Sequence, residues 1–223
     1  MTHTTNQRFH VRDCALVRLS TGYRAQTLRE FKECIEHVPA SSIYHHFWGR
    51  FLQPQFDDPE YNNDFAAWAY HGLHEKALAE KLSVVDPTEF DDIEALRQEL
   101  MERIEDYLFE YDYVPWARAD DQFYFVMGQL LVLDTGMSLE VPEELPEAIP
   151  KMSLGSIFYH FIDARRRTPE RTNDFSAWLL GLSPEYESLA SAMDKLDPYF
   201  SSLKALRTMI HRECLSFFQG DKD

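Results

Sequence analysis

Histidine is the residue type in this chain best suited to chemistry near neutral pH, because its ring can take up a proton or bind a metal ion. His46 and His160 each precede a phenylalanine within the same local pattern. His45, His71 and His74 lie near the first of them in the sequence, and the last two would share one face of a helix. A metal ion needs three or four ligands, which this group could supply.

The alternative role of His46 and His160 is structural. An aromatic residue follows each of them and apolar residues surround them, as is typical of a buried histidine that bonds a nearby turn or a backbone carbonyl. The surroundings of His160 offer no further histidines, so a metal site would be confined to the neighbourhood of His46. We favour the structural role and predict no bound metal.

A second pattern, N-D-F-x-A-W, also occurs twice. Its aspartate lies where a helix would begin, and a short side-chain oxygen there can accept hydrogen bonds from free backbone amides. Its tryptophan has the spacing of a core residue, although an indole can also stack on a ligand. With the two histidines, the fold-signature or possible ligand-contact residues are His46, His160, Asn63, Asp64, Trp68, Asn173, Asp174 and Trp178.

The sequence signatures of common catalytic sites are missing. None of G-x-S-x-G, G-x-x-x-x-G-K-[ST], H-E-x-x-H, C-x-x-C or G-x-G-x-x-G occurs. Eight glycines in 223 residues also leave little scope for loops that wrap a phosphate. We therefore assign no catalytic residue and no cofactor, and we favour a protein that is not an enzyme.

Charge is distributed unevenly along the chain. Residues 86–112 contain eleven acids and two bases, which indicates a solvated helix face or a docking surface for a basic partner. The two loops that follow the histidine patterns have opposite charges, and we predict that they pair within one chain or between two chains of a homo-oligomer. Their charged residues are Asp57, Asp58 and Glu60 in one loop and Arg165, Arg166 and Arg167 in the other.

The patterns recur because the chain repeats itself. The motif S-I-x-x-H-F begins at residues 42 and 156, N-D-F-x-A-W at 63 and 173, and A-L-R at 95 and 205. Matches in this order, with one short insertion, indicate an internal duplication. We interpret the chain as a first module at 9–112, a linker at 113–122 and a second module at 123–223.

Each module is expected to be mainly helical. Residues 9–19 predict a short strand, and the Thr-Gly pair at 21–22 predicts a turn after it. Thr27 and Glu30 form a capping-box pattern, and residues 93–108 show the clearest amphipathic period. The predicted fold is mainly α with short β elements (a minor α+β part), built from two tandem pseudo-symmetric helical modules.

The second module should differ at its first helix. Pro142, Pro146 and Pro150 remove backbone donors there and leave room for a short helix at most. Aromatic residues near the linker are expected to pack between the modules, and an exposed one would mark a partner site. They are Tyr107, Phe109, Tyr111, Tyr113 and Trp116.

Composition excludes several classes of protein. The chain has 38 Asp and Glu against 22 Lys and Arg, and its net charge of −16 argues against binding nucleic acid or anionic lipid. No apolar run reaches the ~18 residues of a transmembrane helix, and the start lacks the basic and apolar regions of a signal peptide. Three cysteines without a C-x-x-C pair suit a reducing compartment. We expect an acidic, cytoplasmic protein with no nucleic acid or membrane partner.

The chain resembles an uncharacterised prokaryotic family, a domain of unknown function of about this length. Thr21-Gly22, the two motifs with His46 and Trp68, Leu78-Ala79 and their counterparts carry the resemblance, which covers nearly the whole chain. One copy is similar to a small helical module appended to otherwise unrelated prokaryotic proteins. That resemblance implies an accessory or interaction role and assigns no ligand.

The sequence thus predicts a non-catalytic protein-interaction or regulatory accessory protein, with another protein as its partner. A duplicated module with unequal surfaces can bridge two partners or bind one of them twice. The alternative is a metal- or small-metabolite-binding protein that uses a cleft between the modules near His45, His46, His71 and His74.

Overall fold

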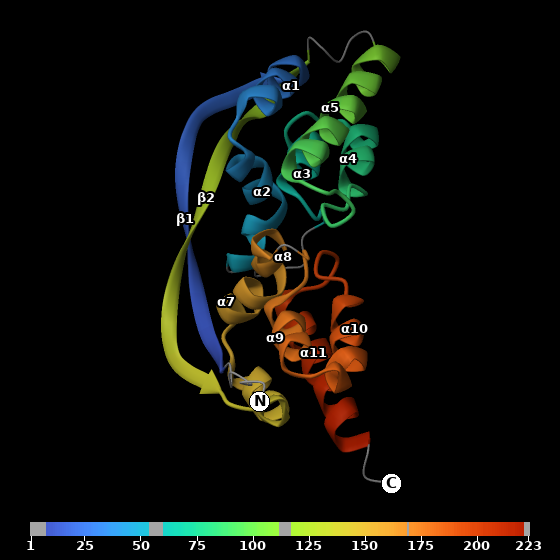
Figure 1. The fold of residues 1–223 in the computed structure, drawn as a ribbon. Helices are drawn as coiled ribbons and strands as arrows, with labels where there is room; N and C mark the ends of the chain where they lie inside the picture. The colour runs from blue at the N-terminus through green and yellow to red at the C-terminus, as the bar shows by residue number, and fades with distance from the viewer. Residues whose placement is uncertain (1–7, 54–59, 112–116, 169, 221–223) are drawn as a thin grey trace. The chain divides into compact units, whose positions relative to one another are not determined.

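The computed structural model of the chain describes residues 8–53, 60–111, 117–168 and 170–220 (Figure 1). The described chain is mainly helical and contains one two-stranded antiparallel sheet, which confirms the predicted fold class at this level. In chain order the elements are β1 (Phe9–Thr27), α1 (Leu28–His37), α2 (Ala40–Trp48), η1 (Gly49–Leu52), α3 (Asp64–His71), α4 (Lys76–Ser83), α5 (Ile93–Glu110), β2 (Arg118–Leu139), η3 (Pro142–Glu144), α6 (Leu145–Ala148), η4 (Ile149–Lys151), α7 (Leu154–Ile157), η5 (Phe158–Asp163), α8 (Ala164–Arg167), α9 (Asp174–Leu182), η6 (Pro184–Tyr186), α10 (Glu187–Asp194) and α11 (Leu203–Gln219).

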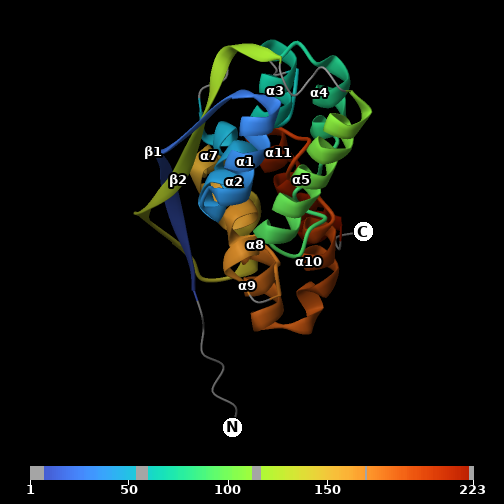
Figure 2. The same cartoon turned by 90° about the horizontal axis from the view of Figure 1, so that it is seen from above.

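The sheet consists of β1 and β2, which run side by side (Figure 2). Thr21 donates a hydrogen bond from Oγ1 to the backbone carbonyl of Phe125, and Thr135 donates the same bond to Val11, each at 2.6 Å. The two strands therefore pair with one constant antiparallel register. They are 19 and 22 residues long, whereas the sequence predicted short β elements.

The predicted turn at 21–22 is wrong, because β1 continues through it to Thr27. Gly22 has a φ of +82°, and Gly136 in β2 has a φ of +72°. Glycine has no Cβ and adopts this conformation without a steric cost, so the backbone can bend there while the strand goes on. The threonine before each glycine bonds the other strand instead of closing a turn.

Spatial contacts divide the chain into two compact units. The first unit is residues 16–130, and the second unit is the described part of 1–15 and 131–223. Each unit thus contains one stretch of β1 and one stretch of β2. The modules predicted at 9–112 and 123–223 follow the repeat in the sequence and stay a prediction. The spatial units have other bounds, because each strand has residues in both units.

The first unit packs α1 to α5 around an aromatic core. The predicted capping box is present at the start of α1, where Glu30 accepts a hydrogen bond from the amide of Thr27 at 3.2 Å. The ring of Phe31 lies 5.0 Å from that of Phe123 and 5.6 Å from that of Phe125, centroid to centroid, so β2 supplies part of this core. Helix α5 buries Leu96, Leu100, Ile104 and Tyr107 along one face, which confirms its amphipathic period.

The second unit has a shorter first helix, as the prolines predicted. Pro142 and Pro150 fall in the 3₁₀ turns η3 and η4, and α6 between them is four residues long. Next comes α7, followed by the π-helix η5, which carries His160. Helix α11 packs on α6, α7 and α10 through its buried face. In the part of the chain that the structure describes, no helix is both long and apolar enough to cross a membrane.

Candidate functional site

His46 in the first unit belongs to a chain of hydrogen-bonded groups that joins α2, α3 and β2. Its side chain is buried, with 4% of its surface exposed. Its Nδ1 lies 2.9 Å from Oδ2 of Asp64, and the backbone N–H of Val126 donates to its Nε2 at 3.0 Å. The rings of Phe65 and Phe123 pack on the imidazole at centroid distances of 5.3 and 4.7 Å.

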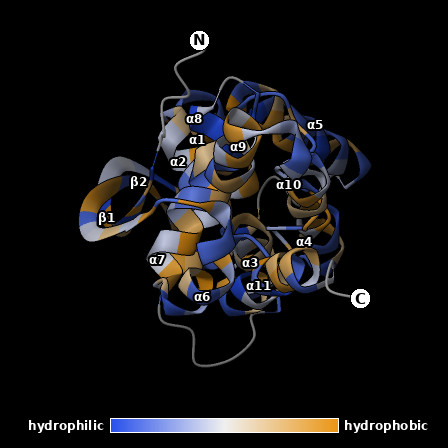
Figure 3. Cartoon of the chain, turned by 60° about the horizontal axis from the view of Figure 1, so that its bottom comes forward, coloured by the Kyte–Doolittle hydropathy of each residue, from blue (hydrophilic) through white to orange (hydrophobic). Residues whose placement is uncertain are grey.

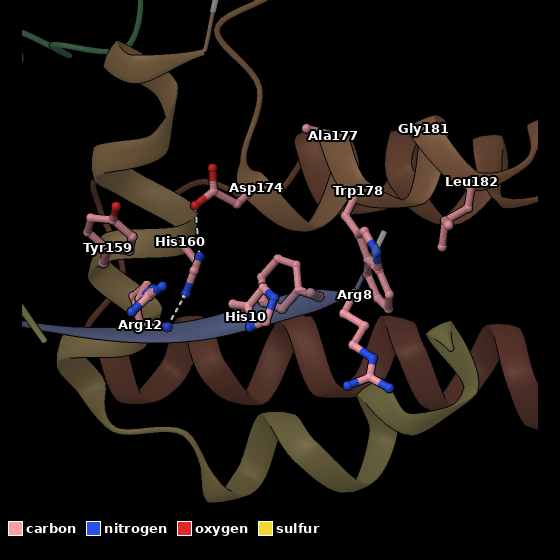
Figure 4. A pocket seen from close by; sticks show the side chains of 11 residues that line it. Arg8, His10, Arg12, Tyr159, His160, Asp174, Ala177, Trp178, Gly181 and Leu182 are labelled. Carbon is pink, nitrogen blue, oxygen red and sulfur yellow. Dashed lines mark hydrogen bonds and ion pairs between the residues drawn. The ribbon is translucent and has the colours of Figure 1, made fainter. Parts of the chain in front are cut away.

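His160 makes the same contacts in the second unit. Its Nδ1 lies 2.7 Å from Oδ2 of Asp174, and the backbone N–H of Arg12 donates to its Nε2 at 2.8 Å. Phe9 and Phe175 pack on the ring at 4.8 and 5.8 Å. The contact to Asp174 and the one to β1 are visible as dashed lines in Figure 4.

These bonds fix the protons on both rings. A backbone N–H can only donate, so Nε2 must accept, and the ring proton of the neutral histidine is therefore on Nδ1, where it is donated to the aspartate. Neither nitrogen is left to take a proton from a substrate or to bind a metal. This geometry favours the structural role of His46 and His160 that the sequence suggested.

The asparagines before the two aspartates cap α3 and α9. Oδ1 of Asn63 accepts from the amide of Ala66 at 2.8 Å, and Oδ1 of Asn173 accepts from that of Ser176 at 2.9 Å. The prediction that the aspartate would be the N-cap was thus wrong by one residue, because the N-cap is the asparagine before it. The aspartate is the first helical residue, and its carboxylate holds the histidine instead of the helix amides.

Trp68 and Trp178 anchor the two cores and are 7% and 8% exposed. The indole of Trp68 stacks on Phe31 at 4.6 Å and donates from Nε1 to the carbonyl of Asp121 at 2.7 Å. Trp178 packs on Phe9 at 5.3 Å, so the strand contact recurs in the second unit.

His45 is buried beside His46 and fills a narrow space in the first unit. Its Nδ1 is without a hydrogen-bond partner among the described residues. A Cβ added at Gly49 would lie 2.3 Å from that atom, and one added at Gly128 would lie 2.8 Å from it, so two glycines bracket the ring. Burial, with the neighbouring His46, lowers the pKa of His45 to about 4.

The structure does not join the four candidate histidines into a metal site. His71 and His74 have 64% and 65% of their side-chain surface exposed, whereas His45 and His46 are buried. His74 already contacts Asp120 at 2.7 Å. Within the described ranges, no group of three or more histidine, cysteine or acidic side chains could hold a metal ion.

The cysteines are not activated for nucleophilic chemistry. Burial, together with the carboxylates of Asp13 and Asp163, raises the pKa of Cys14 to about 12. Burial also raises the pKa of Cys214 to about 12 and that of Cys34 by a smaller amount. A thiolate is the reactive form, and these surroundings disfavour it.

The basic loop of the second unit forms α8 and is held by a carboxylate and a backbone carbonyl of its own unit. Arg166 and Arg167 donate from Nε to the buried carboxylate of Asp163, at 2.5 and 2.9 Å. Arg165 donates to the carbonyl of Asp194 at 3.3 Å. These contacts pair part of the positive charge of this loop within the second unit, so that part does not need the acidic loop of the first unit.

The acidic loop of the first unit is described in part. Glu60 lies 4.0 Å from Nε2 of His71, and both side chains are exposed. Asp57 and Asp58 lie outside the described residues, as do Tyr113 and Trp116 of the linker. The pairing of the two charged loops therefore stays a prediction.

A pocket of about 360 Å³ lies in the second unit, between the start of β1 and helix α9 (Figure 4). Arg8, His10 and Arg12 line it from the strand, and Trp178 and Leu182 line it from the helix. Sequence reasoning missed the three basic residues. Their alternation was the available signal, because every second residue of a strand points to the same face.

Helix α5 packs on the first unit much as α11 packs on the second, but the net charges of the two helices have opposite signs. Arg97 of α5 donates to the carbonyl of Ile35, and Arg207 of α11 donates to that of Met152. Yet α5 contains six acids and two bases, whereas α11 contains three bases and one acid. Hydrophilic residues cover much of α5 in Figure 3.

One large apolar side chain stands out on α5. Phe109, in its last turn, is 90% exposed, although Tyr107 two residues earlier is 2% exposed. Glu102 and Asp106 are exposed too, and their spacing of three or four residues places them on the same helix face as Phe109. The outer face of α5 therefore ends in an aromatic ring next to carboxylates.

Comparison with known proteins gives two matches. The model of a family described as a family of unknown function (DUF5752) matches residues 6–215. The structure of OrfY from Thermoproteus tenax is similar, with a TM-score of 0.81 and 27% sequence identity over 96% of each chain. No curated protein matches the chain.

Proposed function

The chain belongs to the family of unknown function DUF5752, and we propose that it works as a non-catalytic accessory protein that binds another protein through the outer face of α5. The observation that carries this proposal is the exposed Phe109 at the end of an acidic helix face. Aromatic side chains supply much of the binding energy at protein interfaces, and surrounding charge steers the encounter.

The non-catalytic part of the proposal is supported by the two histidines. In each unit both ring nitrogens are occupied, by an aspartate and by a backbone amide. The buried thiols have raised pKa values as well. The two histidines thus join strands to helices, and the thiols are held in their unreactive form.

The partner class follows from the contrast between α5 and α11. Both helices bury one face, and each has an arginine that donates to a backbone carbonyl. The packing of the fold therefore requires the same buried face and the same arginine contact from each helix. The acidic excess of α5 is not shared by α11 and is therefore not required by that packing. A partner with a basic rim around an apolar pocket would complement α5.

The repeated histidine network also supports an internal duplication into two helical modules of pseudo-two-fold relation. In that case the two modules have kept the same interior and diverged at the surface. Such a chain can bind two different partners, or one partner at two places, and gain affinity from the link between them.

Capture of partners from a lysate of the source organism, read by mass spectrometry, tests the proposal. Three variants are compared with the wild type: Phe109→Ser, the double change Glu102→Lys with Asp106→Lys, and the control Phe200→Ser, an aromatic residue that is 51% exposed in the second unit. We expect a stoichiometric partner that both α5 variants lose and the control keeps. A partner retained by both α5 variants, or no partner at all, would contradict the proposal.

A further inference from the structure

We propose that the pocket of the second unit binds a small organic anion, in which a carboxylate or phosphate group meets Arg12 and His10 and an apolar body lies against Trp178. The pocket is about 360 Å³, within the range of known small-molecule sites. This inference goes beyond the proposed partner binding, because it concerns the other unit and another class of ligand.

The strand wall of the pocket is basic. Arg8, His10 and Arg12 alternate with the buried Phe9 and Val11, and all three line the pocket beside Phe9. At about 3.3 Å per residue, Arg8 and Arg12 are roughly 13 Å apart along the strand. Basic side chains thus occur at three positions of this segment (Figure 4).

Two acids that do not line the pocket already form ion pairs with these arginines. Arg12 lies 2.6 Å from Oδ2 of Asp134, and Arg8 lies 2.6 Å from Oε1 of Glu140. The four side chains are 38% to 64% exposed. Exposed ion pairs contribute little free energy, so the anionic group of a ligand can compete with these carboxylates for the guanidinium groups.

The helix wall provides the apolar part of the pocket. Ala177, Trp178 and Gly181 lie on one face of α9, three and four residues apart. A Cβ added at Gly181 would meet nothing within 4 Å, so the wall is open at that point. Asp174, at the base of this face, is engaged by His160 and by Arg167, which leaves its charge compensated.

The first unit shows that the fold does not require the basic side chains. In the repeat, Val126 corresponds to Arg12 and Tyr124 to His10. Val126 gives the same backbone hydrogen bond to His46 that Arg12 gives to His160. The histidine network thus uses only the main chain at this position and makes no use of the Arg12 side chain.

Isothermal titration of the full-length protein with three probes tests the inference. The probes are phenyl phosphate, benzoate and the neutral benzyl alcohol, with inorganic phosphate as a fourth titrant. We expect one or both aromatic anions to bind at least tenfold more tightly than benzyl alcohol and more tightly than inorganic phosphate. The preferred anion then shows whether a phosphate or a carboxylate is the natural group.

Variants separate a binding role of the pocket from a structural one. Arg12→Gln should weaken binding at least tenfold, whereas the control Arg24→Gln, on the same strand in the first unit, should not change it. Asp134→Asn removes the competing carboxylate but can still accept from Gly136, and it should tighten binding about threefold or more. A purely structural ion pair would not produce that gain.

Two results would overturn the inference. One is the absence of binding by every anionic probe at millimolar concentration in both the wild type and Asp134→Asn. The other is binding that Arg12→Gln and Arg24→Gln alter to the same extent.

Discussion

Each of His46 and His160 accepts one hydrogen bond from a backbone amide, and that bond determines whether the histidine can act as a base. A histidine held by an aspartate through Nδ1 is arranged like a catalytic base, but such a base needs a free Nε2. Here Nε2 accepts from Val126 or from Arg12, so the ring joins a strand to two helices. The same pair of residues would act on a substrate only if the strand moved away.

Replacement of His46 tests this structural role. His46→Ala leaves the amide of Val126 and the carboxylate of Asp64 without their bond, and we expect a loss of about 1–3 kcal/mol in the free energy of unfolding. Denaturant unfolding measures it. The control His74→Ala removes an exposed contact to Asp120 and should change stability by less than about 0.5 kcal/mol. Equal effects of the two changes would contradict the role.

The pH dependence of stability should reflect His45. Its pKa is about 4 in the folded state and near 6.5 when unfolded, so between these values the unfolded chain binds more protons. Stability should therefore fall as the pH is lowered from about 6.5 to 4, by up to roughly 3 kcal/mol from this residue. We expect His45→Phe to reduce that slope in unfolding experiments at several pH values. An unchanged slope would show that His45 does not titrate in this way.

At the scale of elements, close packing of β1 on the start of α7 depends on a glycine. A Cβ at Gly155 would lie 2.2 Å from Oδ1 of Asp13 and 2.5 Å from the backbone carbonyl of Cys14. Because a backbone atom cannot turn aside, Gly155→Ala should cost about 1–3 kcal/mol, measured by thermal or denaturant unfolding.

The matched control for this change is Gly181→Ala in α9. Nothing lies within 4 Å of the added Cβ there, and alanine favours a helix over glycine by about 1 kcal/mol. Stability should therefore stay the same or rise. A loss at Gly181 as large as that at Gly155 would mean that the added methyl group itself, and not the strand contact, sets the cost.

The sequence predicted elements better than it predicted their partners. The capping box at Thr27, the amphipathic period of α5 and the proline-broken α6 were all readable, because each depends on residues that are near one another in the chain. The length of β1 was not, because its second half has few buried side chains and is fixed by pairing with β2. The pocket was missed for the same reason: its two walls are about 170 residues apart in the chain.

At the scale of the whole molecule, the spatial units and the sequence repeats lead to different expectations for fragments. The fragment 16–130 contains the strand segment that carries Phe123, Phe125 and Val126, whereas the fragment 9–112 lacks it. Each buried phenylalanine contributes roughly 1.5–3 kcal/mol, a large share of the 5–15 kcal/mol that stabilise a typical domain.

We therefore expect 16–130 to give a dispersed amide NMR spectrum and 9–112 to give a collapsed one. Far-UV circular dichroism and a cooperative thermal transition serve as a second measurement. A well-folded 9–112 fragment would show that the first repeat needs nothing from β2 and would contradict the division into units described above.

Each unit contains a segment of both strands, and this determines the order in which the two units can fold during synthesis. Residues 9–15 emerge before the first unit, but Phe9 packs on Phe175, which emerges after it. At about 5–20 residues per second, Phe9 and Val11 wait roughly 10–40 s for the rest of the second unit. The first unit is complete once residue 130 has emerged, so it can form while the earliest segment is still uncovered. Residues 9–15 are thus made before the first unit and reach their place after it.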